Sequence, residues 1–214
     1  MTAATEVHRI VGGRLDGNCY VVACDGDAVV LDPGGEAGPV VDRCVAGGLR
    51  VHAVLATHGH ADHLAAAVEV CRRLDAPFHL HPADAFLLPR VNFYRRFMTG
   101  EPPIDVPAVD VELGDGDTLR FGALAVTVVH TPGHTPGGVC LAIGDDVFTG
   151  DTLIGDRPGR TDLPGGDPVA LARSLGALGR ACPPGATIRP GHGAPVPAAA
   201  VPALREHLPG AVAS

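Results

Sequence analysis

Metal-binding side chains are concentrated in one short run of this 214-residue chain, T-H-G-H-A-D-H at residues 57–63. The run holds His58, His60, Asp62 and His63, all of which offer nitrogen or oxygen donors. A single histidine is more often a surface or hydrogen-bonded core residue than a ligand. Three histidines and an aspartate within six residues indicate a common role instead. Such donors suit zinc, iron or manganese better than a thiolate-preferring copper site, and metals of this kind activate water or dioxygen.

The run lies where a strand is expected to end and a helix to begin. Residues 51–57 are apolar and β-branched, which predicts a buried strand. From about Asp62 onward, apolar residues recur at steps of three and four, which predicts a helix with one buried face. The residues of that face are Leu64, Val68, Cys71 and Leu74. A strand and a packed helix on either side would hold the donors in place.

Three further donors have the same placement, each just after a strand-like apolar run. They are His134 after residues 126–129, Asp151 after residues 147–150, and His192 after residues 188–191. The loop at residues 131–138 holds two prolines and three glycines, which predicts an irregular turn. Donors that follow separate strands can gather at one edge of stacked sheets, so we expect all seven to form a single metal site.

The sequence resembles the metallo-β-lactamase-fold superfamily over nearly its whole length. The resemblance rests on V-V-L-D-P-G at residues 29–34, on the run at residues 57–63, and on P-G-H-G at residues 190–193. Within the superfamily, the chain most resembles the glyoxalase II-like, or hydroxyacylglutathione hydrolase-like, group. The resemblance implies an α/β fold, an αββα sandwich of two mixed β-sheets flanked by helices, and a metal-dependent hydrolase.

The resemblance also implies a role for each donor. One metal would be held by His58, His60 and His134, the second by Asp62, His63 and His192, and Asp151 would bridge the two. The two divalent ions would be zinc, iron or manganese, and a hydroxide between them would be the nucleophile. Asp62 and Asp151 are therefore the candidate catalytic carboxylates. Asp32 would orient the metal-binding loop or a ligand imidazole, or it would only cap the turn that follows its strand.

Departures from other branches of the superfamily narrow the function. Many of its β-lactamases have Cys where this chain has Asp151, which argues against antibiotic hydrolysis. Its lactone hydrolases have a Tyr shortly after the bridging aspartate, whereas Thr152 follows here. The formal net charge of −8 argues against a nuclease or any nucleic-acid partner, because phosphate-binding surfaces are usually basic.

Three classes of function remain open. The first is hydrolysis of thioesters such as 2-hydroxyacyl thioesters, small molecules whose thiolate leaves with little proton donation. The second is a mononuclear iron persulfide dioxygenase, because residues 159–162, G-R-T-D, resemble a segment found in both groups. The third is another hydrolase of this fold or a non-catalytic metal-binding protein. The short stretch after His192 predicts no helical glutathione-binding domain and leaves the thiol carrier open.

Two arginines are candidates for binding a substrate carboxylate. Arg160 is the stronger candidate and Arg157 the weaker one. A structural pair between Arg160 and Asp162 is the alternative, because bidentate arginine–carboxylate pairs serve both purposes.

The remaining pattern predicts one domain over residues 1–214 with mixed strands and outer helices. Strands are expected near residues 8–12, 18–24 and 27–31, helices near residues 36–46 and 167–178, and hairpin turns at residues 25–27, 114–117 and 144–146. Asp167 and Pro168 are the expected N-cap and first residue of the second helix.

Four of the eight aromatic residues lie in residues 86–98. Their helical spacing fits core packing, a pocket wall or a homodimer contact. No secretory signal or membrane-spanning run is visible in the sequence, which predicts a cytoplasmic protein that contacts no membrane.

Overall fold

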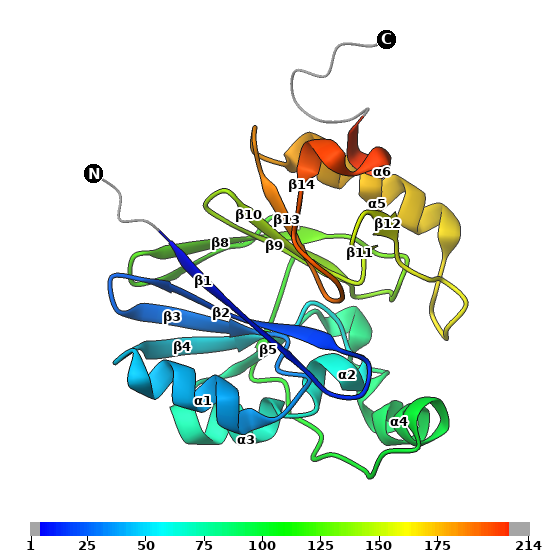
Figure 1. Cartoon of the computed structure of the whole chain (residues 1–214). Coiled ribbons are helices and arrows are strands. Elements are labelled where there is room, and N and C mark those ends of the chain that lie inside the picture. Colours follow the sequence, from blue (N-terminus) through cyan, green and yellow to red (C-terminus); the bar gives the residue numbers. More distant parts are fainter. Residues whose placement is uncertain (1–4, 206–214) are drawn as a thin grey trace.

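The structure, a computed structural model, describes residues 5–205. Residues 1–4 and 206–214 lie outside the described residues. The prediction that the chain has no secretory signal rests partly on residues 1–4. Two β-sheets are stacked face to face, with helices on the outer face of each (Figure 1). This arrangement confirms the predicted αββα sandwich.

The first sheet has six strands in the spatial order β1-β2-β3-β4-β5-β6. Its strands are β1 (Glu6–Gly12), β2 (Gly17–Cys24), β3 (Asp27–Leu31), β4 (Arg50–Leu55), β5 (Phe78–Leu80) and β6 (Val111–Glu112). Strands β1 to β3 pair antiparallel, and β3 to β6 pair parallel. The sheet is therefore mixed, with short, tight turns on its antiparallel side and helical crossovers on its parallel side.

The second sheet also has six strands, in the order β14-β13-β10-β9-β8-β7. Its strands are β7 (Thr118–Phe121), β8 (Leu124–His130), β9 (Val139–Ile143), β10 (Asp146–Gly150), β13 (Thr187–Pro190) and β14 (Val196–Pro197). Only β10 and β13 pair parallel. A two-stranded ribbon, β11 (Leu153–Ile154) with β12 (Arg157–Pro158), lies beyond β10.

Helices cover both outer faces of the sandwich. The α-helices are α1 (Ala37–Ala46), α2 (Ala61–Leu64), α3 (Ala67–Leu74), α4 (Val91–Thr99), α5 (Pro168–Ala181) and α6 (Pro202–Arg205), and the 3₁₀ turns are η1 (Pro82–Asp84), η2 (Leu88–Arg90) and η3 (Ala198–Ala200). Helices α1 and α3 pack on the first sheet, and α5 and α6 pack on the second (Figure 1). Among residues 5–205, no helix is both long and apolar enough to cross a bilayer.

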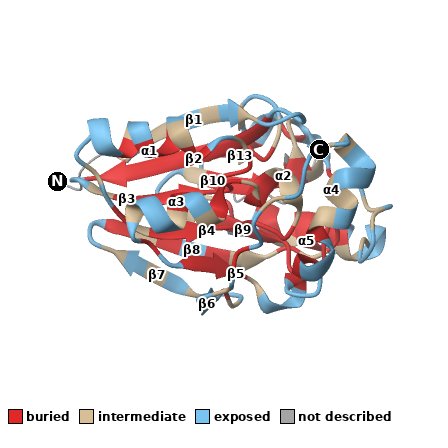
Figure 2. Ribbon diagram, turned by 90° about the horizontal axis from the view of Figure 1, so that it is seen from below, coloured by how far each residue is buried: buried red, intermediate tan, exposed pale blue. Residues whose placement is uncertain are grey.

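Strand β2 shows how the layers are held together. All eight of its residues are buried, and successive side chains point to opposite faces of the sheet. Tyr20 and Val22 join the core between the two sheets, while Cys19 and Val21 join the core under α1 and α3. Burial on both faces explains why this strand is an almost continuous apolar run, and Figure 2 shows the buried strands enclosed by exposed helix surfaces.

The predicted helix after residue 62 is interrupted. The backbone N–H of Ala66 donates to the Pro33 carbonyl at 2.8 Å rather than to a carbonyl within the helix, and the chain restarts as α3. The buried face of α3 consequently uses Ala67 and Val70, whereas Val68, Cys71 and Leu74 of the predicted face are only half-buried. By contrast, α5 begins as predicted, with the Asp167 side chain accepting hydrogen bonds from two backbone N–H groups.

One of the three predicted hairpins is wrong. The turns at residues 25–27 and 144–146 do join antiparallel neighbours, β2 to β3 and β9 to β10. The turn at residues 114–117 instead leads from β6 of the first sheet to β7 of the second. A polar turn marks the end of a strand but carries no information on which sheet the next strand joins.

Candidate metal centre

The seven predicted donors lie together at one edge of the sandwich. Strand β8 runs in the same direction as β10, because both pair antiparallel with β9, and β10 is parallel to β13. The three strands therefore end at the same edge, where His134, Asp151 and His192 follow. The loop after β4 brings His58 and His60 to this edge from the first sheet, and α2, which follows directly, brings Asp62 and His63.

The donors form overlapping groups whose ligand atoms lie within 4.8 Å of one another. We call His58, His60 and His134 the first triad, and Asp62, His63 and His192 the second triad. These are the two sets that the sequence resemblance implied, and a further group joins His58, His63 and Asp151. The His/Asp cluster fits a dinuclear metal site.

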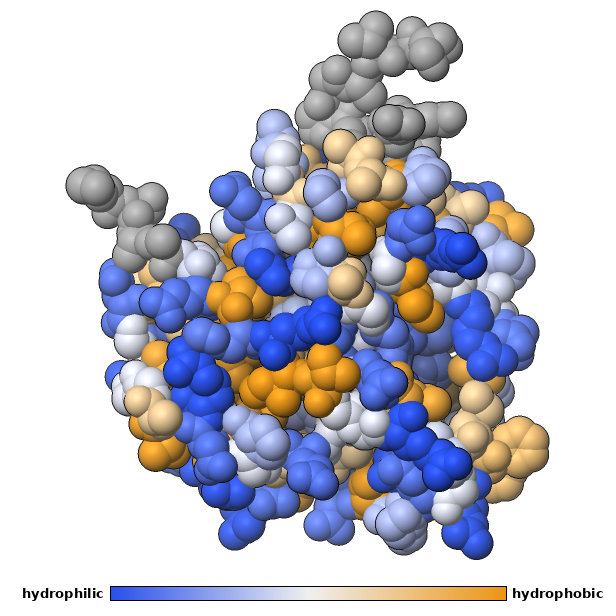
Figure 3. Space-filling view, in the orientation of Figure 1, coloured by the Kyte–Doolittle hydropathy of each residue, from blue (hydrophilic) through white to orange (hydrophobic). Residues whose placement is uncertain are grey.

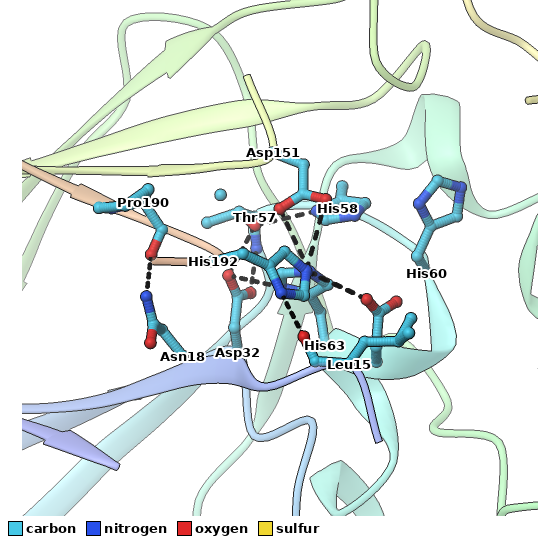
Figure 4. A network of polar contacts seen from close by, with 12 residues as sticks. Leu15, Asn18, Asp32, Thr57, His58, His60, His63, Asp151, Pro190 and His192 are labelled. Carbon is cyan, nitrogen blue, oxygen red and sulfur yellow. Dashed lines mark hydrogen bonds and ion pairs between the residues drawn. The ribbon is translucent and has the colours of Figure 1, made fainter. Parts of the chain in front are cut away.

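Asp151 lies between the two triads. Its Oδ1 is 3.5 Å from His63 Nε2, and its Oδ2 is 3.6 Å from both His134 Nε2 and His192 Nε2. Figure 4 shows Asp151, His63 and His192 pointing toward one another, with His60 to one side. One carboxylate thus has an oxygen close to histidines of both triads.

Several buried polar atoms at this point have no hydrogen-bond partner among the described residues. They are His58 Nε2, both ring nitrogens of His63, and Asp151 Oδ1; the His63 nitrogens and Asp151 Oδ1 have ion-pair contacts of 3.2–3.5 Å, to Asp32 and to each other, but no hydrogen bond. A buried polar atom left unpaired costs about 1–3 kcal/mol, and such atoms are rare in native proteins. Their concentration among N and O donors is what a bound metal ion would explain, so the residues fit the metals that the sequence implied.

Two histidines of the first triad, His58 and His60, have lowered pKa values. Burial, together with the neighbouring His63 and His60, lowers the pKa of His58 well below its usual value. Burial and the adjacent His134 lower the pKa of His60 to about 4. Imidazoles in this state keep a lone pair free for a metal.

The second triad carries opposite charges. Burial would lower the pKa of His63, but Asp62, Asp151 and Asp32 outweigh it and raise the pKa well above its usual value. Burial likewise opposes ionisation of Asp62, yet His63 and a hydrogen bond from His192 hold the pKa of that carboxyl low. The Asp62–His192 contact is 3.2 Å long.

Three histidines of the triads are oriented through Nδ1. His134 Nδ1 donates to the Arg160 carbonyl at 2.7 Å, and His192 Nδ1 donates to the Leu15 carbonyl at 2.9 Å. His58 Nδ1 lies 3.1 Å from Thr57 Oγ1. In each case Nε2 is left to face the other donors, as is usual for metal-binding histidines.

The contacts of Asp32 agree with the orienting role that the family resemblance implied rather than with turn capping alone. Its carboxylate accepts from the Thr57 N–H and the Thr57 hydroxyl, both at 2.7 Å, and its Oδ2 is 3.2 Å from His63 Nδ1. It therefore contacts the second triad directly and reaches His58 of the first through Thr57.

Close backbone approaches explain two motif glycines. A Cβ at Gly34 would lie 1.5 Å from the Asp62 carbonyl oxygen, and a Cβ at Gly191 would lie 2.3 Å from Asp151 Oδ1. Any side chain at either position would displace a donor.

The sequence offered no signal for several supporting residues. Asn18 Nδ2 donates to the carbonyls of Pro190 and Gly193, both at 2.8 Å, and so ties the His192 loop to β2 (Figure 4). A second residue, Asp84, lies buried beside the first triad. Neither belongs to a recognisable motif, and their partners, backbone groups and the Thr135 hydroxyl, come from distant parts of the chain.

A cavity of about 340 Å³ opens over the donors. Its walls come from the β1–β2 turn, α4 and the segment after β11, and they include Arg14, Leu15, Tyr94, Arg95, Met98, Ile154, Arg160 and Leu163. The volume lies within the range of small-molecule sites.

Helix α4 resolves the open question of the aromatic segment in part. Phe93 is 68% exposed and Phe97 is 79% exposed, so core packing is wrong for these residues. Tyr94 and Met98 of the same helix line the cavity, which agrees with a pocket wall. The exposed apolar side chains are visible over α4 at the lower right of Figure 3.

The two candidate arginines differ in position. Arg160 lines the cavity and also forms a bidentate pair with Asp162, with both N–O distances 2.7 Å. Arg160 therefore lies where it could bind a substrate carboxylate and also forms the structural pair with Asp162, so both alternatives stay open for it. Arg157 does not line the cavity, and its side chain is 86% exposed beside Asp156.

Comparisons with known proteins agree with this geometry. The family model described as the metallo-beta-lactamase superfamily matches residues 12–192. A hydroxyacylglutathione hydrolase of Anaeromyxobacter dehalogenans (strain 2CP-C) is 36% identical over 178 residues, which cover 83% of this chain and 61% of the relative. The chain thus spans about three fifths of that relative's length.

Two solved structures are similar over most of the chain. The BLEG-1 B3 metallo-beta-lactamase superposes with a TM-score of 0.85 at 32% identity, covering 93% of this chain and 99% of that chain. The structure of TTHA1623 in a di-iron-bound form gives a TM-score of 0.81 at 34% identity, covering 95% and 99%. The chain belongs to the metallo-beta-lactamase superfamily, and within it the chain is a metallo-hydrolase.

Proposed function

We propose that this protein hydrolyses thioesters, with 2-hydroxyacyl thioesters as the substrate class, and that it uses two divalent metal ions. The observation that carries the proposal is Asp151, whose carboxylate lies 3.5–3.6 Å from histidines of both triads. An anionic oxygen at that point can offset two cations, where a neutral imidazole would serve one. The first triad would hold one ion, the second triad the other, and Asp151 would bridge them.

Divalent ions bound there would supply Lewis-acid chemistry, acidifying water and polarising a carbonyl. Asp151 and Asp62 provide the negative charge of the site, and the backbone carbonyls of Leu15 and Arg160 hold His192 and His134 in position. The apolar side chains of Tyr94 and Met98 line the cavity and would keep water away from a bound acyl group.

Thioesters are favoured as substrates because of the chemistry of their leaving group. The thiol that leaves has a pKa of about 8.5 if it is cysteine-like, so the thiolate departs without a strong proton donor. The similarity to a protein named hydroxyacylglutathione hydrolase supports the same substrate class. We include zinc, iron and manganese as candidate metals because all accept N and O donors, and the di-iron form of TTHA1623 supports iron among them.

Thiol release and oxygen uptake, measured on one preparation, test the proposal. We expect thiol release from a lactoyl thioester without oxygen uptake, and several thiol carriers should be compared, glutathione among them. Oxygen consumption with a persulfide, with one iron per chain and no thioester cleavage, would reverse the assignment in favour of the dioxygenase.

A β-lactam belongs in the same experiment as a competing substrate. The exclusion of antibiotic hydrolysis rested on Asp151 standing in place of a cysteine, yet a structure named as a B3 metallo-beta-lactamase is similar to this chain. We expect β-lactam turnover to be much slower than thioester turnover. The reverse ranking would refute the proposed substrate class.

A further inference from the structure

A buried carboxylate outside the seven donors connects two of the metal-binding loops. Asp84 ends η1 and is fully buried. Its Oδ2 accepts hydrogen bonds from the Gly59 N–H and the Thr135 hydroxyl, both at 2.8 Å. Its Oδ1 accepts from the Gly137 N–H at 2.5 Å. All three hydrogen-bond donors belong to loops that carry members of the first triad.

The connected loops come from different sheets. Gly59 lies between His58 and His60 in the loop after β4, whereas Thr135 and Gly137 follow His134 in the loop after β8. One carboxylate therefore spans the boundary between the two halves of the first triad.

The backbone is shaped to this contact. A Cβ at Gly137 would lie 2.6 Å from the Asp84 backbone nitrogen, and a Cβ at Gly59 would lie 3.3 Å from the Asp84 Cβ. Both loops consequently approach Asp84 at positions that lack side chains, which allows their N–H groups to reach its oxygens.

The charge on Asp84 makes the contact costly unless it is satisfied. Burial raises the pKa of Asp84, and the hydrogen bonds from Thr135, Gly59 and Gly137 oppose that rise. Within residues 5–205 no ion pair reaches this carboxylate, so its ionised form is supported chiefly by those three hydrogen bonds, with a smaller contribution from nearby His81. A group of this kind favours one arrangement of the two loops over others.

We infer that Asp84 is a positioning residue for the first triad: it sets the separation of the His58–His60 loop from the His134 loop and thereby the metal affinity of that triad. The inference rests on the metal centre of the proposed function, not on its substrate. The second triad is supported by other groups, namely Asp32 and the Leu15 carbonyl. Loss of Asp84 should therefore weaken one triad and spare the other.

The test is a zinc titration of metal-free protein in which only one triad is intact. His192→Ala leaves the first triad complete, and His134→Ala leaves the second. In the His192→Ala background, Asp84→Asn should lower zinc affinity by roughly 10–100-fold, the usual loss when a group that supports metal ligands is removed. In the His134→Ala background, the same change should leave zinc affinity within about threefold.

Matched variants separate positioning from general destabilisation. Asp110→Asn alters a carboxylate that also accepts from a backbone N–H, that of Phe78 at 2.8 Å, but touches neither loop. It should leave zinc affinity unchanged in both backgrounds. Thr135→Val removes one of the three hydrogen bonds and should reproduce part of the loss of zinc affinity caused by Asp84→Asn. Thr135→Ser keeps the hydroxyl and should retain the zinc affinity of its background.

The outcomes distinguish this inference from the proposed activity, because zinc affinity is measured without any substrate. Equal losses in both backgrounds, or no loss in the His192→Ala background, would overturn the role of Asp84. If Asp84→Asn fails to fold, the Thr135→Val and Thr135→Ser pair decides the question by the same criterion. Absence of thioester turnover would count against the proposed function alone.

Discussion

The two triads of the candidate metal centre are built in different ways. The first consists of three imidazoles. Two of them, His58 and His134, are buried, and the side chain of His134 is only 4% exposed. The second contains a carboxylate and is more open, because the side chain of Asp62 is 24% exposed and that of His192 is 16% exposed. Both triads reach the cavity, the first through His60 and His134 and the second through Asp62 and His192, but only the second contains a carboxylate.

Their internal contacts differ accordingly. The second triad offsets its own charge through the 3.2 Å contact between Asp62 and His192, whereas in the first triad His134 Nε2 lies at hydrogen-bond distance, 3.0 Å, from His60 Nδ1. The contrast teaches that charge holds the second triad together and an imidazole–imidazole hydrogen bond the first, while each triad keeps one buried histidine, His58 or His63, with a ring nitrogen that forms no hydrogen bond among the described residues. Asp151 is the group in contact with both.

The largest effect is expected at Asp151, because its loss should weaken metal binding in both triads alike. Asp151→Ala removes the anionic oxygen near both, so metal content should fall in both triads and thioester turnover should drop to the background rate. Metal analysis and thiol release check this outcome. A variant with wild-type metal content and rate would rule out a bridging role.

Single-histidine variants should separate the triads. His134→Ala and His192→Ala are each expected to bind one metal ion fewer than the wild type and to lose hydrolysis, because each removes a donor from one triad only. His52→Ala serves as the control. His52 Nε2 lies 2.6 Å from Asp27 Oδ1, and neither residue belongs to the metal centre. Loss of all metal from either variant would show that the triads do not bind independently.

Asp32→Asn should weaken both triads to a smaller extent. Asp32 contacts His63 directly and His58 through Thr57, and removal of such a supporting group lowers metal affinity by roughly 10–100-fold. Asn tolerates the left-handed backbone at this position, where φ is 49°, so the change isolates the charge. Zinc titration of the His134→Ala and His192→Ala backgrounds measures the two effects, and a loss confined to one triad would contradict the shared role.

The smallest effects are expected at the cavity arginines. Arg160 is already engaged by Asp162, so Arg160→Ala should raise KM for carboxylate-bearing thioesters by no more than about fivefold. Arg14 lines the cavity without an ion pair among residues 5–205, so Arg14→Ala should raise that KM by roughly tenfold, the loss of one charged hydrogen bond.

Neutral thioesters provide the control for both arginine variants. Their KM and the melting temperature should stay at wild-type values, because the carbonyls that orient His134 and His192 belong to the backbone. An equal rise in KM for neutral and anionic thioesters would count against carboxylate recognition at either residue.

The sequence predicted that these seven side chains lie together, because each one follows an apolar strand. Strand ends in a layered fold meet at one edge, so the placement of His134, Asp151 and His192 followed from local patterns. The fold class followed from the family resemblance. The charges of the triads did not, because they depend on burial and on neighbours such as Asp32 that are distant in sequence.

The failures have the same origin. The helix expected after residue 62 breaks because Ala66 bonds to the Pro33 carbonyl, a contact that no helical periodicity encodes. The role of Asp84 was invisible because its three partners are a hydroxyl and two backbone N–H groups from other loops. Local pattern identifies which residues can bind a metal, while long-range backbone contacts determine how firmly they are held.

Native mass spectrometry of the zinc-saturated protein tests the central claim most directly, because it counts the metal ions held by each chain. We predict two zinc ions per chain for the wild type and one for each of His134→Ala and His192→Ala. A single zinc ion per wild-type chain at saturation would contradict the account of two triads joined by Asp151.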